Sequence, residues 1–132
     1  MMKYFVFFVA GSLSLYVRLY AYDGAACKRY AENRNSTLPE KNKSYASTMW
    51  SVECNDNLKA FVFHSRFEGR DDGKVSLKTR QAFVLRQHKK MLPILCEGFQ
   101  SEYWFADVVK TNFEDEVGRL FAEVSVNRIE CR

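Results

Sequence analysis

Few residues of this 132-residue chain could carry acid–base chemistry. It contains two histidines, His64 and His88, and the glutamates Glu97 and Glu102 follow the second histidine. Acid–base catalysis needs a histidine, a carboxylate and a cationic group that converge on one point. No such set is brought together here, so we predict no catalytic residues. We interpret His64 as a half-exposed strand residue and His88 as a residue near a helix end.

The four cysteines are a second group with possible chemistry: Cys27, Cys54, Cys96 and Cys131. An even number of cysteines in a short exported chain indicates two disulfides, for which three pairings are possible. The spacings contain no CxxC or CxH motif, so we expect neither a metal site nor a cofactor.

The amino terminus has the pattern of a signal peptide. Lys3 precedes an apolar run from Tyr4 to Val17, and Arg18 closes that run before it could span a bilayer. We therefore predict a signal peptide over residues 1–21, cleaved after Ala21, and a secreted protein. No later run is long enough to cross a membrane. Removing residues 1–21 leaves 18 positive against 16 negative side chains, so charge alone does not indicate nucleic-acid binding.

Residues 22–47 are polar, and we predict an extended arm there. Two sequons lie in it, which makes Asn35 and Asn42 candidate glycosylation sites. The folded domain is predicted over residues 48–132.

Within that domain the pattern favours an α+β fold. Residues 48–54 and 58–67 resemble a β-hairpin around Asn55-Asp56-Asn57, and residues 76–91 favour a helix capped by Ser76. A long strand over residues 76–91 is the alternative. Four strands are expected afterwards, at residues 92–96, 103–111, 119–126 and 128–131. The predicted architecture is an N-terminal β-hairpin and one α-helix packed on a four-stranded antiparallel sheet.

From His88 onward the chain is similar to the small secreted guanyl-preferring ribonucleases of fungi. The parallels are Pro93-Ile94-Leu95, Ala106-Asp107-Val108-Val109, Leu120 to Val126 and the closing Ile129-Glu130-Cys131. The resemblance implies that Cys54 pairs with Cys131, which leaves Cys27 with Cys96.

The catalytic positions that this resemblance implies are not filled by suitable residues. Met91 stands where the general base is expected, Asp107 or Val108 where the arginine is expected, and Ser125 and Val126 near the expected acid. A fold of this kind without catalytic residues resembles the ribonuclease-like effectors that powdery-mildew fungi secrete into cereal hosts. This resemblance implies a monomeric pseudoenzyme that acts in virulence. Entry into the host cytoplasm, binding of host proteins or host RNA, and recognition by a host immune receptor are also implied.

The chain departs from that effector pattern in two places. Trp50 stands four residues before Cys54 instead of two, and the arm adds Cys27.

Our leading functional prediction is a binding module without catalytic activity. RNA would contact basic side chains and one aromatic: Arg80, Arg86, Lys89, Lys90 and Tyr103. A protein partner fits the sequence equally well. The alternatives are an active secreted ribonuclease with a rearranged site that uses His64 or His88, and a disulfide-rich extracellular inhibitor or ligand.

Overall fold

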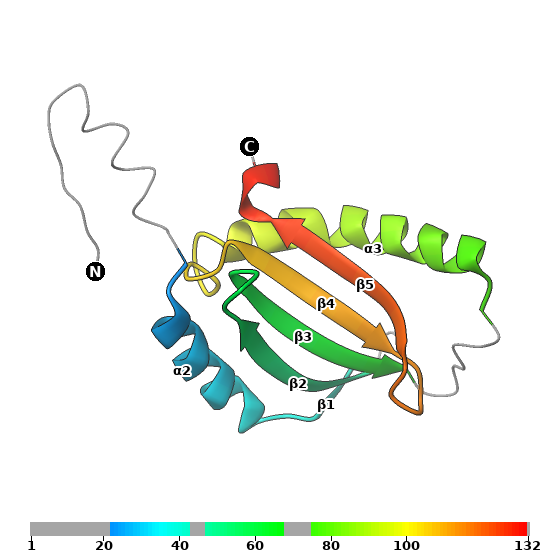
Figure 1. Cartoon of the computed structure of the whole chain (residues 1–132), viewed down its shortest axis with the longest axis horizontal. Helices are drawn as coiled ribbons and strands as arrows, with labels where there is room; N and C mark the ends of the chain where they lie inside the picture. The colour runs from blue at the N-terminus through cyan, green and yellow to red at the C-terminus, as the bar shows by residue number, and fades with distance from the viewer. Residues whose placement is uncertain (1–21, 43–46, 68–74, 132) are drawn as a thin grey trace, which may run out of the picture.

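A five-stranded sheet and two helices form the described part of the chain (Figure 1). The computed structural model of the protein describes residues 22–42, 47–67 and 75–131. The strands follow the order β1-β2-β3-β4-β5 across the sheet. Their bounds are Glu40–Asn42 (β1), Ser47–Asn55 (β2), Ala60–Phe67 (β3), Val108–Glu114 (β4) and Leu120–Asn127 (β5). The helices are α2 (Gly24–Asn35) and α3 (Leu77–Gly98), and the 3-10 turn η3 spans Arg128–Glu130.

The sheet is mixed in direction. β1, β2 and β3 are antiparallel neighbours, β4 and β5 are antiparallel, and β3 and β4 run parallel. Parallel neighbours need a long crossover connection, which here contains α3. The predicted α+β class is confirmed. The predicted arrangement of one helix on a four-stranded antiparallel sheet is wrong, because the sheet has five strands and one parallel pair.

The predicted hairpin is confirmed as β2 and β3. The Asn55 side chain accepts a hydrogen bond from the Leu58 N–H at 3.1 Å, which holds the turn between the two strands. Lys59 completes the turn with a φ of 54°, and β3 then begins at Ala60.

The predicted helix is confirmed and is longer than expected. Ser76 caps α3 by accepting from the Thr79 N–H at 3.1 Å. The helix continues through Pro93 to Gly98, so the strand predicted at residues 92–96 is wrong. A proline inside a helix costs about 3 kcal/mol. Leu95 is buried one half-turn later and Met91 and Leu92 pack against the same core, which offsets that cost.

The polar arm predicted over residues 22–47 is instead α2 and β1 over residues 22–42, Ser47 begins β2, and residues 43–46 lie outside the described residues. Asp23 caps α2 by accepting from the Ala26 N–H at 3.0 Å. The buried side of α2 consists of small residues, Ala26, Cys27 and Ala31, so it lacks the apolar stripe by which amphipathic helices are predicted.

Two further strand predictions differ from the structure near the carboxyl terminus. Residues 103–105 form turns and β4 begins only at Val108, while residues 128–130 form η3 instead of a strand. The strand predicted at residues 119–126 is confirmed as β5.

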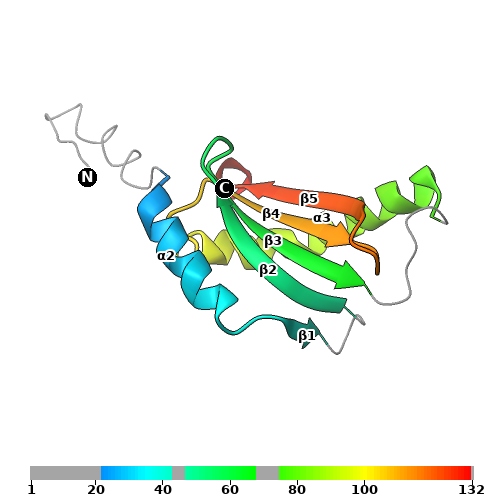
Figure 2. The ribbon, with the colours of Figure 1, turned by 60° about the horizontal axis from the view of Figure 1, so that its bottom comes forward.

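Both helices cover the same face of the sheet, and the core lies between the helices and that face (Figure 2). Alternate residues of β3 point into this core, where Phe61 and Phe63 meet Tyr103 and Phe105. A second cluster toward the other end contains Phe67, Phe83, Phe121 and Ala122. No described helix has the length and apolar character needed to cross a bilayer.

The disulfides join elements that are neighbours in space. Cys27 of α2 pairs with Cys54 of β2, and Cys96 of α3 pairs with Cys131 after η3, with Cα–Cα distances of 6.1 and 5.4 Å. The predicted pairs, Cys54 with Cys131 and Cys27 with Cys96, are therefore wrong. The expected pairing came from the ribonuclease resemblance, whereas here α2 packs beside β2 and places Cys27 next to Cys54.

We predict that each bridge stabilises the fold by a similar amount. Replacing Cys27 and Cys54 together by serine, or Cys96 and Cys131 together, should each lower the free energy of unfolding by about 3 to 4 kcal/mol, because the closed loops are of similar length. Denaturant unfolding measures this loss. Peptide mapping of the unreduced protein checks the pairing, and a peptide linking Cys54 to Cys131 would contradict it.

Candidate functional site

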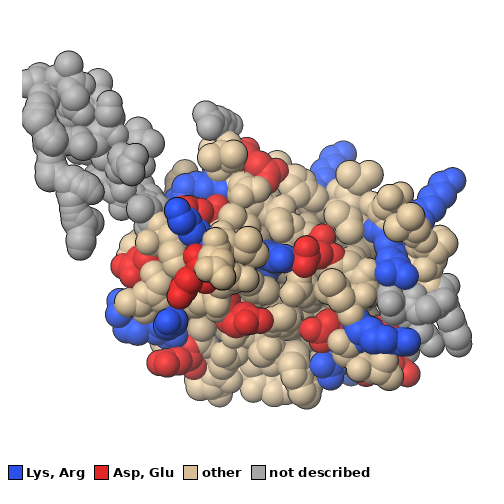
Figure 3. Space-filling model, in the orientation of Figure 1, with Lys and Arg blue, Asp and Glu red and all other residues tan. Residues whose placement is uncertain are grey.

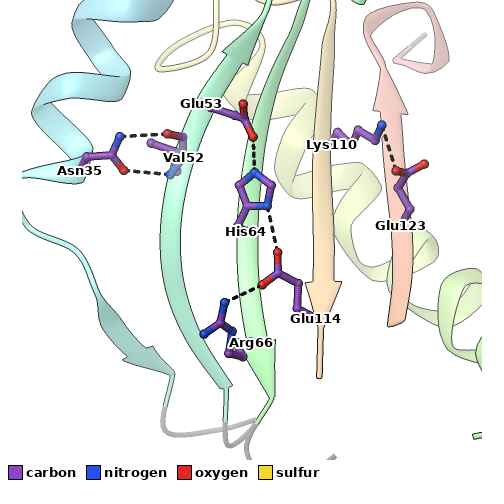
Figure 4. Close-up of polar contacts among 8 residues, drawn as sticks. All are labelled: Asn35, Val52, Glu53, His64, Arg66, Lys110, Glu114 and Glu123. Carbon is purple, nitrogen blue, oxygen red and sulfur yellow. Dashed lines mark hydrogen bonds and ion pairs between the residues drawn. The ribbon is translucent and has the colours of Figure 1, made fainter. Parts of the chain in front are cut away.

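His64 lies on the sheet face that the helices leave open, between two carboxylates (Figure 4). Its Nε2 contacts Glu53 of β2, and its Nδ1 lies 3.3 Å from Glu114 of β4. The strand register explains the grouping, because His64 pairs with Ser51 and Asn112 and these carboxylates stand diagonally across from it. Both ring nitrogens are engaged, so neither is presented to a substrate. The prediction of a strand position is confirmed, and only 18% of the side chain is exposed.

The network continues across the open face. Arg66 lies 3.1 Å from the other oxygen of Glu114, and its guanidinium covers the Trp50 ring at 4.8 Å. On the next two strands Lys110 and Glu123 form an ion pair of 3.0 Å (Figure 4). Acidic and basic side chains therefore pair across β3, β4 and β5, which stabilises a face that the described helices do not cover.

His88 lies within α3 and not at its end. Its Nε2 is 2.8 Å from Glu130, which also accepts from the Asn127 N–H at 2.8 Å. The hydrogen bond from the Asn127 backbone is the main cause of a lowered pKa of Glu130, and the contact with His88 lowers this pKa further. His88 thus joins η3 to α3.

The other acid–base candidates do not converge. Glu97 is exposed on the last turn of α3, and Glu102 accepts a hydrogen bond from the Tyr30 hydroxyl at 3.2 Å. Met91 is on α3, packed against the core, whereas Val126 is buried on β5. Among the described residues no group of three or more His, Cys, Asp and Glu side chains could hold a metal ion.

The residues predicted to bind RNA are divided between the surface and the core. Arg86, Lys89 and Lys90 are exposed on α3, and Arg80 is half-buried on the same helix. Tyr103 packs against Tyr30, Phe61 and Phe63, with ring centroids 5.7 to 5.8 Å away. Burial is the main cause of a raised pKa of Tyr103, and the nearby Tyr30 and Glu102 raise this pKa further. Its ring is therefore part of the core and does not form a stacking surface beside the basic residues.

A concave apolar groove lies between the first half of α3 and β5. It has a volume of about 500 Å³. The α3 wall is Leu77, Arg80, Gln81, Val84 and Leu85, and the floor is Phe121 and Ala122 of β5. We call this the α3/β5 groove.

The rim of this groove exposes large apolar side chains. Leu77 is 69% exposed and Leu85 is 73% exposed, whereas Phe121 below them is 2% exposed. The sequence contained a signal for it, because Ala82-Phe83-Val84-Leu85 is a run of four apolar residues. Successive helix residues are about 100° apart, so such a run cannot all face the sheet.

Of the two candidate glycosylation sites, Asn35 has a described side chain, whereas most of the Asn42 sequon lies outside the described residues. The Asn35 amide donates to the Val52 carbonyl and accepts from the Val52 N–H, both at 2.9 Å. Its side chain therefore ties α2 to β2. Asn42 ends β1, and the rest of its sequon lies outside the described residues.

The fold is similar to that of a protein of known structure. No family model matches the chain, and no curated protein matches it. Among solved structures it is similar to the pilotin EpsS of the type 2 secretion system of Vibrio vulnificus. The TM-score is 0.53 at 14% sequence identity, over 82% of this chain and 89% of the pilotin. Similarity at this level shows a common fold.

We predict that Glu114 stabilises the open face. Changing Glu114→Gln should cost about 1 to 3 kcal/mol of unfolding free energy, because the His64 ring and the Arg66 guanidinium lose a largely buried carboxylate partner. The control Glu123→Gln removes a more exposed carboxylate from one lysine and should cost less than about 1 kcal/mol. Denaturant unfolding compares them, and equal losses would contradict a central role for Glu114.

We also predict that Asn35 stabilises the contact of α2 with β2. Asn35→Ala should cost about 1 to 3 kcal/mol, since it leaves both backbone groups of Val52 without these bonds. The control Asn33→Ala, exposed on the same helix, should stay within about 0.5 kcal/mol of the parent. Thermal or denaturant unfolding measures both, and a neutral Asn35→Ala would refute the assignment.

Proposed function

We propose that this protein is an exported binding module without catalytic activity, and that it binds a protein segment in the α3/β5 groove. The observation that carries the proposal is the groove itself, with two exposed leucines above an apolar floor. Binding sites for protein segments are commonly apolar grooves of this kind.

The charge around the groove defines the chemistry of the partner. Arg80 lines the groove, and Lys78 and Arg86 are exposed on the same helix. No acidic residue occurs in α3 before Glu97. Basic side chains gather over the first half of α3, whereas both signs are mixed over the rest of the same face (Figure 3). The complementary partner is an apolar segment that carries acidic side chains.

The environment of the histidines supports a binding role over catalysis. Both nitrogens of His64 contact carboxylates of the open face, and His88 Nε2 contacts Glu130. Neither histidine lines the α3/β5 groove. An active ribonuclease with a rearranged site would need one of them near a bound phosphate.

Export is supported by the signal-peptide pattern and by the cysteines. All four cysteines are bonded in two bridges, which suits an oxidising compartment.

The resemblance to powdery-mildew effectors adds a narrower proposal, that the partner belongs to a plant host. The expected disulfide pairing and the strand expected at Pro93-Ile94-Leu95 are wrong, so the narrower proposal now rests on the order of the sequence motifs and on export. The structural neighbour is a pilotin of a bacterial secretion system, and at its low identity it supports the fold alone.

The experiment is a selection of displayed random peptides on the oxidised mature protein. We expect enriched peptides that combine apolar and acidic residues. Leu85→Glu should weaken their binding at least about tenfold, because it puts an acidic side chain on the apolar rim. The matched control is Ile94→Glu, which changes an equally exposed apolar residue of the same helix away from the groove and should bind normally.

RNA is the alternative outcome of this test. Single-stranded RNA that binds the parent and Leu85→Glu equally, but not a Lys89→Glu, Lys90→Glu double variant, would replace the protein-segment proposal. Peptides that bind Leu85→Glu as well as the parent would show that the groove is not the site.

A further inference from the structure

The floor of the α3/β5 groove belongs to the last strand of the sheet. No described strand pairs with the outer side of β5. The Arg128 N–H donates to the Asp107 carbonyl at 2.8 Å, which fixes the alternation of the antiparallel ladder. In an antiparallel ladder every second residue of a strand bonds to the neighbouring strand. Because Arg128 bonds to β4, the backbone groups of Val126 and Val124 also bond to β4, and those of Ser125 and Glu123 point away from it, toward the outer side of β5.

The opposite edge of the sheet is closed. β1 has three residues and ends its pairing at Met49 of β2. Beyond that point the Asn35 amide takes both backbone groups of Val52, and α2 is bridged to Cys54. Proteins commonly blunt sheet edges in these ways.

β5 carries few of these protections. Its eight residues contain no proline and a single charged residue, Glu123, which is paired with Lys110. A long edge of this composition is a template for another strand. Near the end of β5, α3 covers the strand, and Val126 lies in the core there. Toward the start of β5 the helix and the strand diverge, and the groove lies between them (Figure 1).

We infer that the ligand binds as an extended peptide that adds a sixth strand to the outer edge of β5. This inference rests on the proposed function and specifies the form of the partner. In an added strand, alternate side chains point to opposite faces of the sheet. One set enters the α3/β5 groove above Phe121 and Ala122 and is apolar, and the other set continues the polar open face beyond Glu123. An acidic residue of the peptide lies near Arg80.

Charge disfavours a second copy of this chain as the occupant. Pairing β5 with β5 of another copy about a twofold axis would bring two α3 helices to one junction. In such a pair the two helices would run in opposite directions, so Lys78, Arg80 and Arg86 of one copy would lie beside the second half of the other helix. That half carries Lys89 and Lys90, and Glu97 is the only acidic residue of the helix, so like charges would predominate at the junction.

The test uses the peptides selected on the oxidised protein, N-methylated at alternate residues. We expect that methylation in one register weakens binding at least about tenfold, because every second amide donates to β5, and that the other register binds normally. Equal weakening in both registers would indicate a helical ligand, and no weakening in either would indicate contacts through side chains alone. Both results overturn strand addition while leaving groove binding intact.

Amide hydrogen exchange tests the edge without any ligand. In the free protein the amides of Glu123 and Ser125 should exchange at least about tenfold faster than those of Val124 and Val126, and bound peptide should slow them. Equal protection in the free monomer would mean that the edge is already covered. Protection that rises with protein concentration, together with a dimer in sedimentation, would identify a second copy and overturn the peptide proposal. The Leu85→Glu comparison reports separately on the groove.

Discussion

The parallel pairing of β3 with β4 is the constraint on which the rest of the structure depends. Parallel neighbours cannot be joined by a tight turn, so the chain must cross the sheet between them, and α3 makes that crossing. The 22 residues of α3 extend about 33 Å, whereas β4, with seven residues, extends about 24 Å. The helix is longer than the strands it covers. Its first half therefore exposes Leu77 and Leu85 beside β5, and the groove follows from the topology.

The disulfides hold elements that bury little apolar surface. α2 contributes mainly small buried residues, and the Cys27–Cys54 bridge and Asn35 fix it to β2. η3 has no buried residue, and the Cys96–Cys131 bridge and the His88–Glu130 contact fix it to α3. A domain of this size buries a limited core, so cross-links at its periphery have a large share in its stability.

An element of this structure can be predicted from the sequence when its signal lies within a few neighbouring residues. The hairpin, the Ser76 cap and β5 depend on turn residues, a capping hydroxyl and alternation, all of which act within a few residues. α2 could not be predicted because its buried residues are small and its apolar periodicity is weak. The parallel pair and the disulfide partners are contacts between distant segments, which a single sequence does not contain in readable form. At the candidate site, the basic residues of α3 were correctly placed on a helix, but their separation from Tyr103 depends on the tertiary packing of that ring.

Some residues of the α3/β5 groove are exposed and others belong to the core. Only changes at the exposed ones can test binding without also destabilising the fold. Leu77 and Leu85 keep most of their surface in water, so they contribute little to the free energy of folding. Phe121 is buried against Phe67 and Phe83, and its loss would open a cavity in the second core cluster at a cost of about 3 to 5 kcal/mol. A loss of binding in a Phe121 variant would therefore be ambiguous. Changes at the two leucines act on the ligand and leave the fold intact, because an exposed leucine is replaced at little cost wherever no partner covers it.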